Sequence, residues 1–485
     1  MKSNNHMLAI VFAFLTFFTA IQADELHFFV SIVRNGIRSP TMDLKTGIES
    51  QPTLTPPGMR QQYMLGTYYA QRYRTYYKDF LKKSYEPEKI YVRSSDMDRN
   101  LNSAQSLLLG LFPFGTGPNV TGSVSTALVP PMQLSVNASS LGSAAALGNY
   151  QPVAIHSTSP SVDFLLRAFS KETCPNLSQN HSNVTHTNST TTYQNISALV
   201  ATTAEQIRNT TNISSSVSLD TLEDMYKFYD NLAASHQNGI DTGINQTSEL
   251  FRTISFLAQF YDLHVNHGST QLLQTELSPL LTEISSNLSA AKKDKTDLEG
   301  AIYLAHDETL SGFLAMLGVT NTSCVSTYYF NNQSSDNNCT GLPEFSSHIE
   351  LELVTDKSDK WYVIVLYNGA ELTPCGGKRC TFDNFQSLIS SYIVTASQYQ
   401  SLCGNIMLQS APYKQYDYSS DPTVKIKAAT SGGGVWGLIV LNLALAAALF
   451  VVKKYGRDFV RRKFAQHVPF VGEEQLGEEL RPMPA

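Results

Sequence analysis

The segment Val33-Arg34-Asn35-Gly36-Ile37-Arg38-Ser39-Pro40 decides how the rest of this chain is interpreted. The apolar run from Leu26 to Val33 leads into it and predicts a buried β-strand, which ends where glycine and proline break the pattern. Arg34 and Arg38 therefore lie on the loop at the carboxyl end of a strand, where open α/β sheets bind ligands. A guanidinium is planar, permanently charged and grips phosphate or carboxylate with two parallel hydrogen bonds. Taken alone, however, the segment is more typical of a solvated loop with two surface arginines.

A second strand that ends in polar residues lies further along the chain. Lys89 to Val92 predicts a short strand that runs into Arg93, and an amphipathic helix follows it. Arg93 then stands just before a helix N-terminus, where free backbone N–H groups favour an anion. Arg99 lies one turn into this helix and is assigned a structural role. The apolar face of the predicted helix consists of Met97, Leu101, Ala104, Leu108 and Leu111.

A third strand brings the chain back to the core after a long middle section. Gly300 to Ala305 is an apolar run that ends at His306-Asp307, and a helix is expected from Glu308 to Leu317. Ile349 to Val354 and Trp361 to Tyr367 predict two antiparallel strands that extend the sheet.

These segments resemble, in the same order, the motifs of the histidine acid phosphatases, the branched histidine phosphatase superfamily. The family signature is Arg-His-Gly-x-Arg-x-Pro, followed by a Leu-Thr-x-x-Gly helix, an Arg-Ser-Thr-Asp segment and a His-Asp pair. The resemblance covers roughly Leu26 to Cys403 and implies an α/β fold, namely a three-layer α/β/α sandwich core with an inserted helical cap domain. At the second residue of the signature the family has its nucleophilic histidine, and this chain has Asn35.

The resemblance also implies a role for each matching residue. In the family, the histidine attacks phosphorus, positively charged groups hold the phosphoryl oxygens, and the aspartate protonates the leaving oxygen. Asp307 matches this proton donor, and Asn35 stands at the position of the lost nucleophile. His156 matches a strand-end histidine that lines the substrate pocket. The phosphate-binding residues carried over to this chain are Arg34, Arg38, Arg93 and His306.

Asn35 separates three hypotheses about function. The nitrogen lone pair of an amide is delocalised, so Asn35 can form hydrogen bonds but cannot attack phosphorus. The favoured hypothesis is a pseudophosphatase that binds phosphate or phosphomonoesters but is catalytically impaired. The alternative is an active acid phosphatase that hydrolyses phosphomonoesters at acidic pH with another nucleophile, such as water activated by Asp307. A structural surface glycoprotein with a vestigial cleft is the third.

The middle of the chain predicts an inserted domain. We expect core segments at residues 24–155 and 292–410, with a helical cap between them at residues 156–291. Within the cap, residues 176–216 are rich in Asn, Ser and Thr and predict an exposed loop. Helical stripes follow, one with Asp220 and Glu223 at capping-box spacing and one, from Gln271 to Ala291, that is interrupted at Pro279.

Both ends of the chain indicate a secretory address. Residues 1–23 combine a basic residue, an apolar segment and a small residue at the cleavage site, as a signal peptide does. After a linker at residues 411–434, residues 435–452 are uncharged and suffice for a transmembrane helix, and the basic flank places the tail, residues 453–485, in the cytoplasm. A buried core helix and a glycolipid-anchor signal are the alternatives for the second run. We therefore expect a single-pass type I membrane protein with its ectodomain outside the cell or in a lysosome-like lumen.

Composition adds the following expectations. The 485 residues carry a net charge of -6 without a basic block, so nothing indicates a nucleic-acid partner. The 6 cysteines predict disulfides, with Cys324–Cys339 and Cys375–Cys380 as local pairs that leave Cys174–Cys403. The resemblance supports a short-loop bridge like Cys375–Cys380 and a long bridge like Cys174–Cys403.

Nothing demands a metal or an organic cofactor, and the oligomeric state stays open. Candidate glycosylation sites include Asn119, Asn137, Asn176, Asn183, Asn188, Asn195, Asn209, Asn212, Asn245, Asn287, Asn321 and Asn332.

Overall fold

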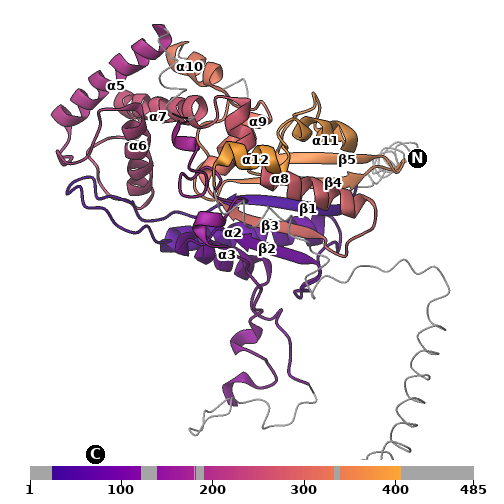
Figure 1. Ribbon diagram of the computed structural model, residues 1–485. Coiled ribbons are helices and arrows are strands. Elements are labelled where there is room, and N and C mark those ends of the chain that lie inside the picture. Colours follow the sequence, from indigo (N-terminus) through magenta and orange to yellow (C-terminus); the bar gives the residue numbers. More distant parts are fainter. Residues whose placement is uncertain (1–23, 122–138, 180, 182–190, 332–338, 406–485) are drawn as a thin grey trace, which may run out of the picture. The chain divides into compact units, whose positions relative to one another are not determined.

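A computed structural model of the protein describes residues 24–121, 139–179, 181, 191–331 and 339–405, which form a mixed α/β fold as predicted (Figure 1). The predicted signal peptide, the linker, the transmembrane helix at 435–452 and the cytoplasmic tail lie outside these residues. Within the described ranges, no helix has the length and apolar character needed to cross a membrane.

The described residues contain a sheet of 7 strands in the order β2-β3-β1-β4-β5-β6, with β7 paired to β5. The strands are β1 (Glu25–Arg34), β2 (Ile90–Ser94), β3 (Gly300–Ala305), β4 (His348–Thr355), β5 (Trp361–Tyr367), β6 (Ala370–Glu371) and β7 (Arg379–Thr381). β2, β3 and β1 are parallel neighbours, and β4 and β5 continue the sheet in antiparallel fashion. The predicted strands are thereby confirmed, and the three parallel strands bring segments distant in sequence to one edge.

Helices pack on both faces of this sheet and in a separate cluster. The helices of the described residues are α2 (Pro56–Gln71), α3 (Asp98–Leu111), α5 (Thr191–Thr210), α6 (Leu222–Gln237), α7 (Glu249–Tyr261), α8 (Thr270–Lys292), α9 (Asp307–Met316), α10 (Thr322–Asn331), α11 (Phe382–Ser390) and α12 (Ala396–Cys403). Of these, α5, α6, α7 and α10 form the separate cluster. Side chains alternate along β1, because successive residues of a strand point to opposite faces. Phe28, Val30 and Ile32 pack in one cluster with residues of α8, α9 and α11. Phe29 and Val33 pack in another with α2 and α3, which lie below the sheet in Figure 1.

The helical region between β2 and β3 corrects three expectations. The predicted exposed loop at 176–216 contains α5, because Ile196, Val200 and Ile207 are buried in a common cluster with α6 and α7. α8 runs through Pro279 without interruption. Its fully buried side chains include Leu277, Leu280, Leu281, Ile284 and Leu288. Burying each of them contributes about 1.5–3 kcal/mol, which outweighs the roughly 3 kcal/mol that an internal proline costs.

The capping box of α6 uses Thr221 and Asp224, one residue later than the predicted Asp220 and Glu223. The Thr221 hydroxyl accepts a hydrogen bond from the Asp224 N–H, and the Asp224 carboxylate accepts one from the Thr221 N–H. Both residue pairs have the spacing of a capping box, so the sequence pattern alone does not distinguish them. The residue at which the helix begins determines which pair forms it.

Disulfides join Cys174 to Cys403, Cys324 to Cys339 and Cys375 to Cys380, as predicted. The long bridge ties the segment after β2 to the end of α12. Among the candidate glycosylation sites, Asn287 lies on α8 with 6% of its surface exposed, which leaves no room for a glycan.

Candidate functional site

The carboxyl ends of the three parallel strands carry the charged residues predicted for the site. Arg34 is the last residue of β1 and pairs in register with Ala305, the last residue of β3. His306 follows Ala305 directly and is the N-cap of α9. Arg93 is the penultimate residue of β2. Sheet topology therefore brings these three residues to one edge, although they are far apart in sequence.

The loop after β1 is fixed by a close approach to α2. A Cβ atom at Gly36 would lie 2.4 Å from the carbonyl oxygen of Gly58, and one at Gly58 would lie 2.1 Å from that of Ile37. The two backbones can meet only because both positions are glycine. The Ile37 N–H donates to the Gln61 side chain at 3.0 Å, and its carbonyl accepts from the Thr55 N–H at 3.0 Å.

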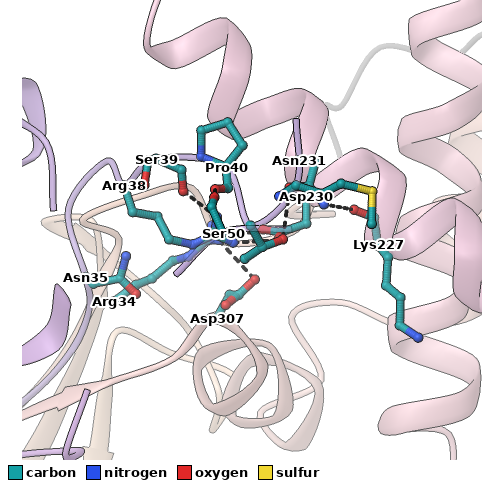
Figure 2. A network of polar contacts seen from close by, with 12 residues as sticks. Arg34, Asn35, Arg38, Ser39, Pro40, Ser50, Lys227, Asp230, Asn231 and Asp307 are labelled. Atoms are coloured by element: carbon teal, nitrogen blue, oxygen red, sulfur yellow. Dashed lines mark hydrogen bonds and ion pairs between the residues drawn. The ribbon is translucent and has the colours of Figure 1, made fainter. Parts of the chain in front are cut away.

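The Arg34 and Arg38 side chains converge on a carboxylate from α6 (Figure 2). Asp230 Oδ2 lies 2.5 Å from Arg38 Nη2, and Asp230 Oδ1 lies 3.7 Å from Arg34 Nη2. Arg34 Nη2 also lies 3.1 Å from Asp307 Oδ2. Both guanidiniums face the ring of Phe345, with 4.2 and 5.7 Å from Cζ to the ring centroid. The arginines are 7% and 6% exposed, so these charges interact in a weakly hydrated setting.

Asn35, which lies between Arg34 and Arg38 in the sequence, is buried, with 3% of its surface exposed. Its Nδ2 donates to the Gly36 carbonyl oxygen at 2.9 Å, and its own backbone carbonyl accepts from the Ser346 N–H at 3.0 Å. The amide is thus held by its own loop and offers hydrogen bonds rather than a nucleophilic lone pair.

Arg93 is anchored by a buried aspartate. Its Nη2 lies 2.8 Å from Asp163 Oδ1 and donates to Thr158 Oγ1 at 3.2 Å. Burial raises the pKa of Asp163, although the Arg93 cation opposes this rise. His156 pairs with Arg93 in an isolated bridge, and its ring stacks on Tyr91 at 4.9 Å between centroids. His156 therefore lies beside Arg93, with its ring on the neighbouring tyrosine.

His306 is buried among cations. Its pKa is lowered well below the usual 6.5 by burial, and then by the charges of Arg99, Arg167, Arg34 and Arg38. The ring therefore stays neutral to a lower pH than that of an exposed histidine. Its Nε2 is buried and finds no hydrogen-bond partner in the part of the chain that the structure describes. A neutral imidazole in this position can donate one hydrogen bond to an anion.

The sequence profile of the Histidine phosphatase superfamily (branch 2) matches residues 3–368. The chain belongs to this superfamily. Among curated relatives of this branch 2 histidine phosphatase, the lysosomal acid phosphatase of Xenopus laevis is 28% identical over 314 residues, which is 62% of this chain and 63% of the relative. The human prostatic acid phosphatase is 40% identical over 116 residues, 22% of this chain and 29% of the relative. The chain thus matches less than two thirds of the length of these relatives.

Solved structures with the same fold include bacterial phytases. The apo form of the Hafnia alvei phytase has a TM-score of 0.50 at 16% identity and covers 78% of this chain and 98% of its own. The Klebsiella sp. ASR1 phytase has a TM-score of 0.50 at 18% identity, with coverages of 78% and 99%. At this identity the likeness supports the histidine phosphatase fold and nothing about the ligand.

Two cavities adjoin Asp230 in this histidine phosphatase. One, of about 240 Å³, is lined by Arg34, Asp307 and Phe345 among others, and Asp230 borders it. The other, of about 320 Å³, is lined by Glu308 and also bordered by Asp230. The pKa of Glu308 is raised well above its usual value by burial and by the neighbouring Asp307 carboxylate.

Sequence reasoning missed three charged residues around the site. Asp230 comes from α6, and no spacing in the sequence marks it. Arg167 lies close enough to lower the pKa of His306, and its Nε is buried without a hydrogen-bond partner among the described residues. Arg99, to which the sequence assigns a structural role, shares both properties, and burial together with the Arg38 charge lowers its pKa to about 10.

Proposed function

We propose that this protein binds phosphate and phosphomonoesters at the carboxyl edge of its parallel strands and is catalytically impaired there. Arg34, Arg38, Arg93 and His306 hold the phosphoryl oxygens, and Asp307 faces the leaving-group oxygen. Asn35 stands where the superfamily's nucleophilic histidine is expected, and His156 lines the substrate pocket. The protein is then a pseudophosphatase.

One observation carries this proposal. Arg34 and Arg38 converge on a single point while Asn35, between them in sequence, presents an amide that bonds to its own loop. Buried guanidiniums keep their charge and bind a phosphoryl group by charge-assisted hydrogen bonds. The covalent step needs a lone pair that the amide does not supply. Phosphate binding and phosphate transfer are therefore separable in this site.

An active acid phosphatase is the second candidate, and the names of the relatives favour it. Lysosomal and testicular acid phosphatases are similar to this chain over 62% of its length. Activity here requires a nucleophile other than residue 35, such as a water molecule oriented by Asp307.

The proposal also covers the cellular location and the domain organisation of the protein. We propose a type I membrane glycoprotein with a signal peptide (1–23), core segments (24–155 and 292–410), a helical cap (156–291) and a membrane span (435–452). The ectodomain lies outside the cell or in a lysosome-like lumen. The helices α5, α6 and α7 support the helical cap. The Cys174–Cys403 disulfide supports folding in an oxidising compartment.

Isothermal titration with inorganic phosphate tests the binding. Replacing Arg38 with methionine removes a charge-assisted hydrogen bond that contributes about 1.5–3 kcal/mol, so the affinity should fall about 10- to 150-fold. Arg60→Met, on the exposed side of α2, is the matched control and should bind like the natural protein. Phosphate affinity that is the same in the natural protein and Arg38→Met, with both folded by circular dichroism, contradicts the proposal.

A further inference from the structure

We propose that Asp230 makes this site select the singly protonated form of a phosphomonoester, R–O–PO₃H⁻, over the dianion. The inference rests on the proposed function, because it specifies which protonation state of the ligand the arginine pair takes. It follows from the contacts of Asp230, from the hydrogen bonds that hold its helix, and from the two cavities that Asp230 borders.

The Asp230 carboxylate occupies the point at which the two guanidiniums meet. Its two oxygens lie 2.5 Å from Arg38 Nη2 and 3.7 Å from Arg34 Nη2. A phosphoryl group held between the two guanidiniums therefore lies beside this carboxylate. Two anionic oxygens in contact repel, whereas a P–O–H group donates a hydrogen bond to the carboxylate.

The helix that carries Asp230 is tied to the loop after β1. Asn231 Oδ1 accepts hydrogen bonds from Thr41 Oγ1 at 2.9 Å and from the Met42 N–H at 2.8 Å. About two turns further on, Asn238 donates from its Nδ2 to the Arg38 carbonyl oxygen at 2.9 Å. These bonds tie α6 to the loop that carries Arg38, so the carboxylate stays at the arginines when a ligand arrives.

The ligand has room beside a fixed Asp230. Both cavities at the site, of about 240 and 320 Å³, are bordered by Asp230 and Tyr226, so these side chains lie between them. Arg34 and Asp307 line the first cavity. A phosphoryl group in this cavity can therefore contact the Arg34 guanidinium while its hydroxyl donates to Asp230.

Other groups near Asp230 titrate and must be separated from it. Burial and the Asp307 charge raise the pKa of Glu308, and burial lowers the pKa of His236. The charged and titratable groups around Asp230 are Arg34 and Arg38 after β1, Arg99 on α3, Tyr226, Lys227, Tyr229 and His236 on α6, Asp307 and Glu308 on α9, and Glu344. The cavity of about 320 Å³ adds Lys171, His181, Glu223 and Glu276.

The test compares phenyl phosphate with phenyl sulfate by calorimetry on the full-length protein. The phosphate ester has a second pKa near 6, so its monoanion rises from about 9% at pH 7 to about 91% at pH 5. Its dissociation constant should therefore fall about tenfold over this range in the natural protein. The sulfate ester has one charge and no proton to donate, so its pH profile reports the protein's own groups. Released phosphate is assayed in the same samples.

Substitutions assign the effect to Asp230. Asp230→Asn should bind the phosphate ester at least as tightly at pH 7 as at pH 5, whereas the exposed control Asp220→Asn should keep the tenfold difference. Equal pH profiles for the two esters in the natural protein overturn the inference without any substitution. Binding of neither ester at any pH overturns the proposed function as well, and pH-independent binding of the phosphate ester overturns only the inference.

Discussion

Replacing Arg93 with methionine should destabilise the protein as well as weaken phosphate binding. Asp163 has no exposed surface, and Arg93 Nη2, 2.8 Å away, is its cationic partner. Its Oδ1 also accepts the Leu166 N–H at 3.3 Å, while its Oδ2 is buried without a partner among the described residues. Arg93→Met therefore leaves a buried carboxylate without its ion-pair partner.

Breaking a buried ion pair from one side costs about 3–5 kcal/mol, because the remaining charge stays desolvated. The double variant Arg93→Met/Asp163→Asn removes that charge and should recover most of the lost free energy of unfolding. Its phosphate affinity should stay about 10- to 150-fold below that of the natural protein, since the charge-assisted hydrogen bond of about 1.5–3 kcal/mol is still missing. Urea denaturation and calorimetry with phosphate measure the two effects separately.

The matched control is the exposed pair of Arg379 and Asp24, whose closest nitrogen and oxygen are 2.5 Å apart with 46% of the arginine side chain exposed. Arg379→Met should change the free energy of unfolding by less than about 1 kcal/mol. A double variant that is as unstable as Arg93→Met, or that binds phosphate like the natural protein, would refute the reasoning about Arg93.

Three further predictions concern pH, a buried network and the signature loop. His306 has its pKa lowered by burial and then by nearby arginines, so the unfolded chain takes up a proton below its usual pKa of 6.5 and the folded protein does not. As the pH decreases below 6.5, the free energy of unfolding should therefore decrease by up to about 1.4 kcal/mol per pH unit. His306→Asn should make this decrease smaller, as measured by urea denaturation at a series of pH values. Arg72→Met leaves the fully buried Glu352, now 2.5 Å from Arg72 Nε, without its cation. Arg72→Met should lower the free energy of unfolding by about 3–5 kcal/mol, as measured by urea denaturation. Adding Glu352→Gln should make this loss smaller. Gly58→Ala, which places a Cβ 2.1 Å from a carbonyl oxygen of the loop, should cost about 1–3 kcal/mol and weaken phosphate binding, whereas Gly377→Ala, with nothing within 4 Å, should do neither.

The parallel strands and their polar ends could be predicted from the sequence because each feature is local. An apolar run such as Gly300–Ala305 indicates a buried strand by itself, and the residue after it must lie at the carboxyl edge. That Arg34, Arg93 and His306 share one edge follows once the strands are parallel neighbours. The strand order, which the sequence pattern does not contain, comes from the structure.

The features that escaped prediction depend on tertiary contacts. α5 has apolar residues at helical spacing, but they are diluted by Asn, Ser and Thr, and only packing against α6 and α7 distinguishes this helix from a loop. α8 passes through Pro279 because the sheet buries the turns on both sides of it. Asp230 meets Arg38 across 192 residues of sequence, and no local pattern announces such a contact.

The most direct test of the central claim is aryl phosphate hydrolysis across acidic pH by the natural protein, Asn35→His, Asp307→Ala and the double variant Asn35→His/Asp307→Ala. Our account predicts that the natural protein is silent, that Asn35→His hydrolyses the ester, and that the double variant loses most of this activity. Hydrolysis by the natural protein that Asp307→Ala alone abolishes would contradict the account, because residue 35 would then not limit catalysis.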